Sequence, residues 1–131
     1  MTDRKLIGMA KEVMKNSYSP YSRFKVGVAI ECSDGSIFTG CNIENPAFSA
    51  TVCAEVAAIS AAISAGKRDF KRIAIISDGN NYCFPCGSCR QLLSEFTPEI
   101  EVLCSRSDER YVSYPLTTLL PMAFGKEQVD R

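Results

Sequence analysis

The chain has 131 residues, of which 46% are hydrophobic and 23% are charged, a balance typical of globular proteins. Its 15 basic and 15 acidic residues cancel, and lysine and arginine form no block, so nucleic acid is not an expected partner. No apolar run approaches the roughly 18 residues that a membrane-spanning helix needs, and the N-terminus does not resemble a secretory signal. We therefore expect one domain over residues 1–131, with no membrane partner.

The sequence contains seven cysteines and no histidine. An odd number of cysteines fits a reducing compartment better than a disulfide framework, so we expect a cytoplasmic protein. Because imidazole is absent, any metal must be held by sulfur or oxygen, and any general base must be a carboxylate, a thiolate, a lysine or a tyrosine. Such a residue set favours zinc over copper or nickel. Iron–sulfur clusters are a weaker alternative because they usually take four cysteines in tighter spacing.

The first third of the chain predicts one helix and a hairpin. Apolar residues at helical spacing predict an amphipathic helix over 3–16, with Thr2 as its N-cap. Alternating apolar and polar residues then predict strands over 24–30 and 36–41. Asp34-Gly35 lies between these strands and is a strong hairpin signal.

The rest of the chain alternates helices with strands. An alanine-rich helix is predicted from Thr51, as N-cap, to Gly66, and a second helix from Pro85 to Pro98. Shorter segments are expected as strands at 72–77, 100–104 and 111–114, a short helix at 116–120, and a polar, loose tail after Gly125. The sum is an α/β protein, a three-layer α/β/α arrangement around a five-stranded mixed sheet.

Two short clusters carry the chemistry: Cys-Ala-Glu beginning at Cys53, and Pro-Cys-Gly-Ser-Cys ending at Cys89. Cys86 and Cys89 are three residues apart and share one face of a helix. Cys53 and Glu55 would diverge by about 200° on a regular helix, so both reach one ion only if Cys53 precedes the helix. Three protein ligands leave a catalytic zinc ion one position for water. The residues thus predict one Zn²⁺ per chain, bound by Cys53, Cys86 and Cys89, with Glu55 as general acid/base.

The residues alone leave other assignments open. Cys86 and Cys89 also have the spacing of a thiol redox pair. Cys83 is evenly spaced with them and is an alternative fourth ligand for a closed structural zinc site. Glu55 also fits a solvated carboxylate at a helix start. The remaining cysteines fit small buried side chains in strands; they are Cys32, Cys41 and Cys104.

The two clusters together resemble the signature of the zinc nucleoside deaminases. A wider likeness to the short, homotetrameric cytidine deaminases covers residues 6–125 and is carried by the stretches Tyr18–Gly27, Gly40–Asn45, Cys89-Arg90-Gln91 and Leu119–Phe124. It implies the cytidine deaminase-like fold and a hydrolase of pyrimidine salvage, which converts cytidine and 2′-deoxycytidine to uridine and 2′-deoxyuridine with release of ammonia. A blasticidin-type or other nucleoside deaminase is the alternative, followed by a non-catalytic structural zinc protein or a thiol redox protein.

The resemblance also implies roles for individual residues. Glu55 would move protons from water to N3 of cytosine and then to the leaving amine. The implied substrate-binding residues are Asn42 and Glu44 at the ribose hydroxyls, Phe24 at the base, Ala54, and Phe124. Because Phe124 is similar to an aromatic residue that reaches a neighbour's active site in this family, the resemblance implies a homo-oligomer, expected to be a tetramer.

Two departures from the family pattern bear on the site. Members with three cysteine ligands often carry an arginine after the catalytic glutamate, where it donates hydrogen bonds to the thiolates; this chain has Val56. Helix amides, and Arg90 or Gln91, are then left to offset a site charge of about −1. Pro46 and Phe48 replace a small residue and a tyrosine near the ribose 5′ end.

Overall fold

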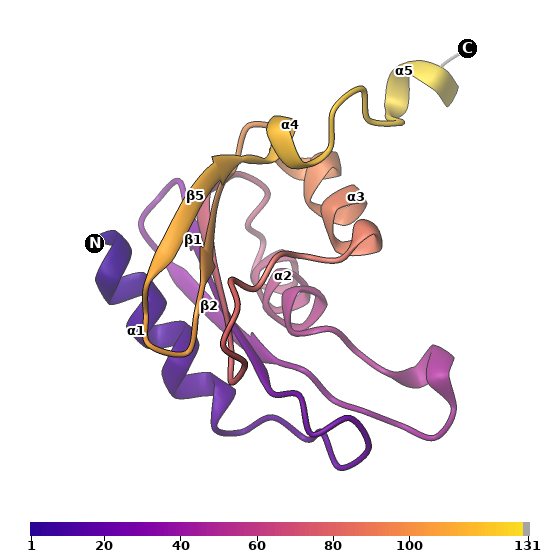
Figure 1. Ribbon diagram of the computed structural model, residues 1–131. Coiled ribbons are helices and arrows are strands. Elements are labelled where there is room, and N and C mark those ends of the chain that lie inside the picture. Colours follow the sequence, from indigo (N-terminus) through magenta and orange to yellow (C-terminus); the bar gives the residue numbers. More distant parts are fainter. Residues whose placement is uncertain (130–131) are drawn as a thin grey trace.

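The computed structural model describes residues 1–129, and a five-stranded sheet lies at its centre (Figure 1). The strands are β1 (Val26–Cys32), β2 (Ile37–Cys41), β3 (Phe70–Ser77), β4 (Glu101–Ser105) and β5 (Tyr111–Pro115). Their order is β2-β1-β3-β4-β5. β3 and β4 pair in parallel, and the other three pairings are antiparallel. The predicted mixed sheet is confirmed.

Helices cover both faces of this sheet (Figure 1). Helix α1 (Asp3–Met14) packs on one face, and α2 (Ala54–Ser64) and α3 (Gly87–Phe96) pack on the other. This confirms the predicted three-layer fold. Within residues 1–129, none of the helices combines the length and the apolar character that crossing a bilayer requires.

The ends of the chain follow the prediction in one place and depart from it in another. Thr2 caps α1, as expected, because its hydroxyl accepts a hydrogen bond from the N–H of Lys5 at 3.2 Å. The tail after Gly125 was expected to be polar and loose; over Lys126–Val129 this was wrong, because these residues form the short helix α5. The last two residues of the tail lie outside the described part of the chain. The side chain of Gln128 accepts from the N–H of Gly125 at 2.6 Å and so closes the start of that turn.

The start of α2 also differs from the prediction. The N-cap is Cys53, with extended backbone at φ −68° and ψ 150°, and not Thr51. Thr51 is engaged elsewhere, since its hydroxyl accepts from the N–H of Asn45 at 3.2 Å. The residues before it form a short 3₁₀ turn, η1 (Phe48–Ala50). A second short helix, α4 (Leu116–Leu119), follows β5 as the sequence predicted.

The two central strands direct alternate side chains to opposite faces of the sheet. Val28 and Ile30 of β1 point to the α2 and α3 side, together with Ile73 and Ile75 of β3. Ala29 lies on the opposite face against α1. All seven residues of β1 are buried, which is expected for a strand between two layers of helices.

Gly40 fixes how closely α2 approaches the sheet. A Cβ atom at this position would lie 2.5 Å from the backbone nitrogen of Ala58 and 2.8 Å from the carbonyl oxygen of Ala54. These are backbone atoms of α2, so relief requires the whole helix to move. Because Cys53 is the N-cap of α2, this contact also sets the position of the first candidate metal ligand.

We predict that Gly40→Ala lowers the free energy of unfolding by about 1–3 kcal/mol, the usual cost of overpacking. Gly8→Ala is the matched control, because nothing lies within 4 Å of its added Cβ in the middle of α1. That change should raise stability by about 0.5–1 kcal/mol. Urea unfolding of both variants measures the difference, and equal stabilities would refute the close approach of α2.

Candidate metal centre and active site

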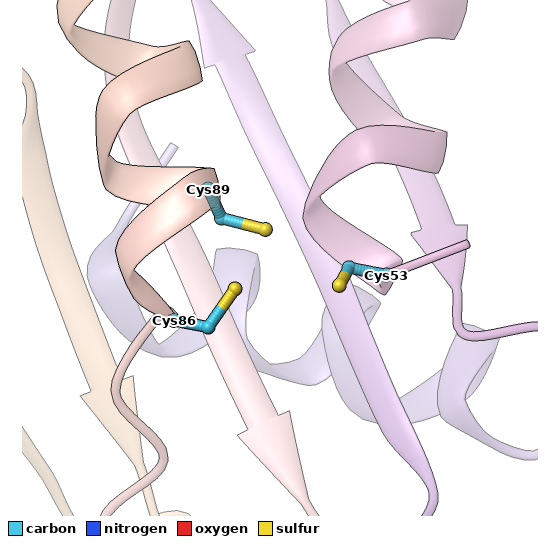
Figure 2. Close-up of side chains that lie close together, drawn as sticks. All are labelled: Cys53, Cys86 and Cys89. Atoms are coloured by element: carbon cyan, nitrogen blue, oxygen red, sulfur yellow. The ribbon is translucent and has the colours of Figure 1, made fainter. Parts of the chain in front are cut away.

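Three thiols from the starts of two helices lie together (Figure 2). Cys53 is the N-cap of α2, Cys86 is the N-cap of α3, and Cys89 lies in the first turn of α3. Their sulfur atoms all lie within 4.8 Å of one another. Tetrahedral zinc with Zn–S bonds of about 2.3 Å would place its sulfurs about 3.8 Å apart. The donor set and its spacing therefore fit one Zn²⁺ per chain.

The backbone at each helix start explains the convergence. Cys53 and Cys86 both have φ −68° with extended ψ values of 150° and 168°. Each side chain therefore departs before its helix begins, and Figure 2 shows the sulfurs directed into the space between α2 and α3. The condition that Cys53 must precede the helix for both it and Glu55 to reach one ion is met. Two helix N-termini also direct partial positive charge at the cluster, which favours thiolates.

The three thiols differ in how readily they ionise. Burial raises the pKa of Cys53 and that of Cys89. Burial also disfavours ionisation of Cys86, but hydrogen bonds from the N–H of Cys89 and the hydroxyl of Ser88 outweigh it, so the pKa of Cys86 lies below its ordinary value of 9.0. All three must be thiolates to bind a metal ion, so binding releases protons.

Glu55 is a buried carboxyl group in the first turn of α2, and 6% of its surface is exposed. Burial raises its pKa, while hydrogen bonds from its own N–H, the Cys89 thiol and the Cys86 N–H limit the rise. The alternative of a solvated helix-start carboxylate is therefore wrong. A buried carboxyl group with a raised pKa beside three converging thiols is suited to accept and return a proton.

A cavity of about 220 Å³ adjoins this cluster. The predicted site residues that line it are Phe24, Asn42, Glu44, Cys53, Ala54, Glu55 and Cys86. Cys89 is fully buried. Phe124 does not line this cavity; its side chain is 61% exposed and borders a separate hollow near the C-terminal segment.

Two further residues line the cavity: Phe84, to which the sequence assigned no role, and Cys83, the alternative fourth zinc ligand. Phe84 lines the cavity and is 44% exposed; its place two residues before Cys86 is the signal that could have identified it. Cys83 lines the cavity as well, and burial raises its pKa to about 11. Cys83 is not one of the sulfurs that converge among residues 1–129, so the closed four-cysteine zinc site is not formed.

Asn42 and Glu44 are anchored before any substrate arrives. The Asn42 side-chain oxygen accepts from the N–H of Val26 at 3.0 Å, and its amide donates to the carbonyl of Phe24 at 2.8 Å. The Glu44 carboxylate accepts from the N–H groups of Tyr21 and Ser22 at 3.0 and 3.1 Å, and from the Ser22 hydroxyl. Both residues therefore hold the 17–24 loop at the cavity. The sequence left a loop-capping role open for Asn42, but it did not predict that Glu44 anchors the loop.

Arg90 and Gln91 do not bind the thiols. The guanidinium group of Arg90 donates to the carbonyl oxygens of Pro85 and Leu119 at 2.7 and 2.8 Å. The Gln91 amide donates to the carbonyl oxygen of Phe124 at 2.7 Å. These side chains instead connect the start of α3 with the C-terminal segment, so the expectation that one of them offsets the thiolate charge directly was wrong.

Comparison with known proteins agrees with this geometry. Residues 1–104 match the family model of the "Cytidine and deoxycytidylate deaminase zinc-binding region". The chain belongs to the cytidine deaminase family. A cytidine deaminase of Sporosarcina psychrophila is 41% identical, with 99% of this chain and 96% of the relative covered. A crystal structure of cytidine deaminase from Burkholderia pseudomallei superposes with a TM-score of 0.91 at 38% identity, covering 95% of this chain and all of the other.

A second relative gives the same assignment. A cytidine deaminase of Halalkalibacterium halodurans is 37% identical, with 99% of both chains covered. Since the matched family model describes a zinc-binding region, the convergence of Cys53, Cys86 and Cys89 fits a zinc site. The thiol redox and non-catalytic alternatives lose their support, because neither accounts for the buried Glu55 beside a cavity.

We predict that Glu44→Ala loosens the 17–24 loop, so that amide hydrogen exchange of Tyr21 and Ser22 becomes severalfold faster. The Ser22 hydroxyl lowers the pKa of Glu44 below its ordinary 4.5. These bonds are therefore fully present above pH 4.5, and should weaken only as the pH falls through the lower, folded-state value. Residue-resolved exchange by NMR tests this, with Glu12→Ala on α1 as control; unchanged exchange in Glu44→Ala would contradict the anchoring role.

Proposed function

We propose that this chain catalyses the hydrolytic deamination of cytidine and 2′-deoxycytidine to uridine and 2′-deoxyuridine, with release of ammonia. The observation that carries the proposal is the buried Glu55 beside three converging thiols, in a cavity that also contains Asn42 and Glu44. Family membership supports the same reaction, since the similar proteins are described as cytidine deaminases.

In this proposal Cys53, Cys86 and Cys89 hold the zinc ion. When bound, zinc supplies the Lewis acidity that makes water nucleophilic near neutral pH. Three cysteine ligands leave one coordination position for the reaction, as catalytic zinc sites require. The partial positive charge of the α2 and α3 N-termini offsets part of the thiolate charge.

Glu55 moves the protons. Its carboxylate accepts a proton from the attacking water and delivers it to N3 of the cytosine ring, which makes C4 electrophilic. The water oxygen bonds to C4, and Glu55 then transfers the second proton to the amino group, so that the C4–N bond breaks and ammonia leaves. One water is consumed for each ammonia released. Because burial raises the pKa of Glu55, the group can take each proton and give it back.

Asn42, Glu44 and Phe24 select a nucleoside. The amide of Asn42 has a second N–H to offer, and the carboxylate of Glu44 accepts hydrogen bonds, which together suit neighbouring ribose hydroxyls. Both side chains are already fixed by the 17–24 loop, so little conformational entropy is lost when the sugar binds. Phe24, 46% exposed at the cavity, offers an aromatic face for the base. Ala54, between Cys53 and Glu55, completes this wall.

The proposal extends to assembly and compartment. Phe124 is 61% exposed and lies outside the cavity of its own chain, which is compatible with a role in the active site of a second copy in a homo-oligomer, a tetramer by family resemblance. The free thiols of this chain suit the reducing cytoplasm. The whole catalytic unit would be one domain, residues 1–131.

We predict that Glu55→Gln lowers kcat for cytidine by about 10²–10⁴-fold, the usual contribution of a proton-transferring group. Zinc content per chain and thermal stability should remain those of the parent, because the amide fills the same space. Loss of cytidine absorbance measures the rate and elemental analysis measures the zinc. Glu12→Gln, in an exposed ion pair on α1, is the control. A Glu55→Gln variant with parental kcat would remove this residue from the mechanism.

Phe124 is tested by subunit complementation. We predict that Phe124→Ala and Glu55→Gln are each poorly active alone, and that refolding a mixture of the two restores part of the activity. In a hybrid oligomer, a site with intact Glu55 receives an intact Phe124 from its neighbour. Mixed chains that are no more active than the sum of the separate variants would show that Phe124 does not act across subunits.

A further inference from the structure

A serine hydroxyl lies against one of the three thiols. The Ser88 hydroxyl oxygen is 3.6 Å from the Cys86 sulfur, within hydrogen-bonding distance for sulfur, and either atom could donate while Cys86 is a thiol. Once Cys86 is a thiolate in a metal complex, the sulfur has no hydrogen left to give. The hydroxyl of Ser88 must then be the donor, so metal binding fixes the direction of this bond.

The surroundings of the cluster make this donor significant. Three thiolates outweigh the charge of one divalent ion, and the buried Glu55 adds a further carboxyl group nearby. The half-buried Val56 offers no donor, and Arg90 is engaged with the carbonyl groups of Pro85 and Leu119. Glu55 meets the cluster only as an acceptor, through the Cys89 thiol. Within residues 1–129, Ser88 is the one residue other than the cysteines whose side chain can donate a hydrogen bond to one of these sulfurs.

We propose that Ser88 is a positioning residue of the zinc site: its hydroxyl donates a hydrogen bond to the Cys86 thiolate and offsets part of the negative charge of the three-sulfur site. The inference rests on the proposed zinc-dependent function and adds a residue to it. By stabilising the negative charge on one sulfur, the bond keeps Cys86 in the thiolate form that binds zinc, in a site that lacks a cationic neighbour. It also keeps the Cys86 sulfur oriented toward the other two.

The test compares Ser88→Ala with Ser88→Thr, which retains a hydroxyl. Ser94→Ala is the matched control, since Ser94 lies on the same helix and its hydroxyl donates to the carbonyl oxygen of Gln91 at 2.7 Å. Zinc affinity is measured by competition with a chromophoric chelator. Co²⁺ substituted for zinc gives a thiolate-to-metal charge-transfer band, whose energy reports the electron density on sulfur independently of catalysis.

We expect Ser88→Ala to bind zinc about tenfold more weakly than the parent, as is usual when a partner of a metal ligand is removed. The charge-transfer band should move to lower energy, because a thiolate without the hydrogen bond donates electrons more readily. Ser88→Thr and Ser94→Ala should match the parent in both measurements. If Ser88→Ala acted only by a general loss of helix stability, Ser94→Ala would also bind zinc more weakly, and the charge-transfer band of Ser88→Ala would not move.

The outcomes separate the two proposals. If the parent binds zinc and deaminates cytidine, but Ser88→Ala retains parental zinc affinity and an unshifted band, the role of Ser88 is refuted and the proposed function stands. If Ser88→Thr loses zinc affinity to the same extent as Ser88→Ala, the hydroxyl is not the acting group, and the role of Ser88 is refuted as well. A parent chain that binds no zinc would overturn the proposed function and the role of Ser88 together.

Discussion

The meeting of two helix starts is the constraint on which this molecule depends. Three sulfurs can share one ion only if α2 and α3 begin side by side, with Cys53 and Cys86 still in extended backbone. The fold secures each start separately. Val52, just before Cys53, pairs with Ile43 of the neighbouring segment, and the carbonyl of Pro85, just before Cys86, is held by Arg90. A helix that began one residue earlier at either place would turn its sulfur away.

The same helix starts also position Glu55, the proposed proton carrier. Glu55 lies two residues into α2, where the helix turns its side chain inward and burial removes it from solvent. Burial of a lone carboxyl group is costly, and the pKa of Glu55 rises in response. The proposed acid–base role of Glu55 accounts for a buried carboxyl group at this place, in a chain that has no histidine.

The polar residues of the cavity serve the fold and the chemistry together. Asn42 and Glu44 hold the 17–24 loop with hydrogen bonds to backbone groups of Val26, Phe24, Tyr21 and Ser22. Both residues also line the cavity. A site built this way is organised in advance, because the groups proposed to bind the substrate are already restrained by the protein. Gly40 belongs to the same arrangement, since it lets α2 lie directly on β2.

Local pattern alone determined much of this protein. The periodicity of apolar residues predicted the helices and strands. The spacing of Cys86 and Cys89, with the absence of histidine, indicated a sulfur-bound metal. Both features can be read from residues close together in the chain and from composition. The sequence could not show that the Thr51 hydroxyl binds the backbone of Asn45, so that Cys53 becomes the N-cap of α2. Nor could it show that Arg90 donates to the carbonyl oxygens of Pro85 and Leu119. Long-range packing decided those contacts, together with the burial of Glu55, because each depends on distances between segments that the order of residues does not specify.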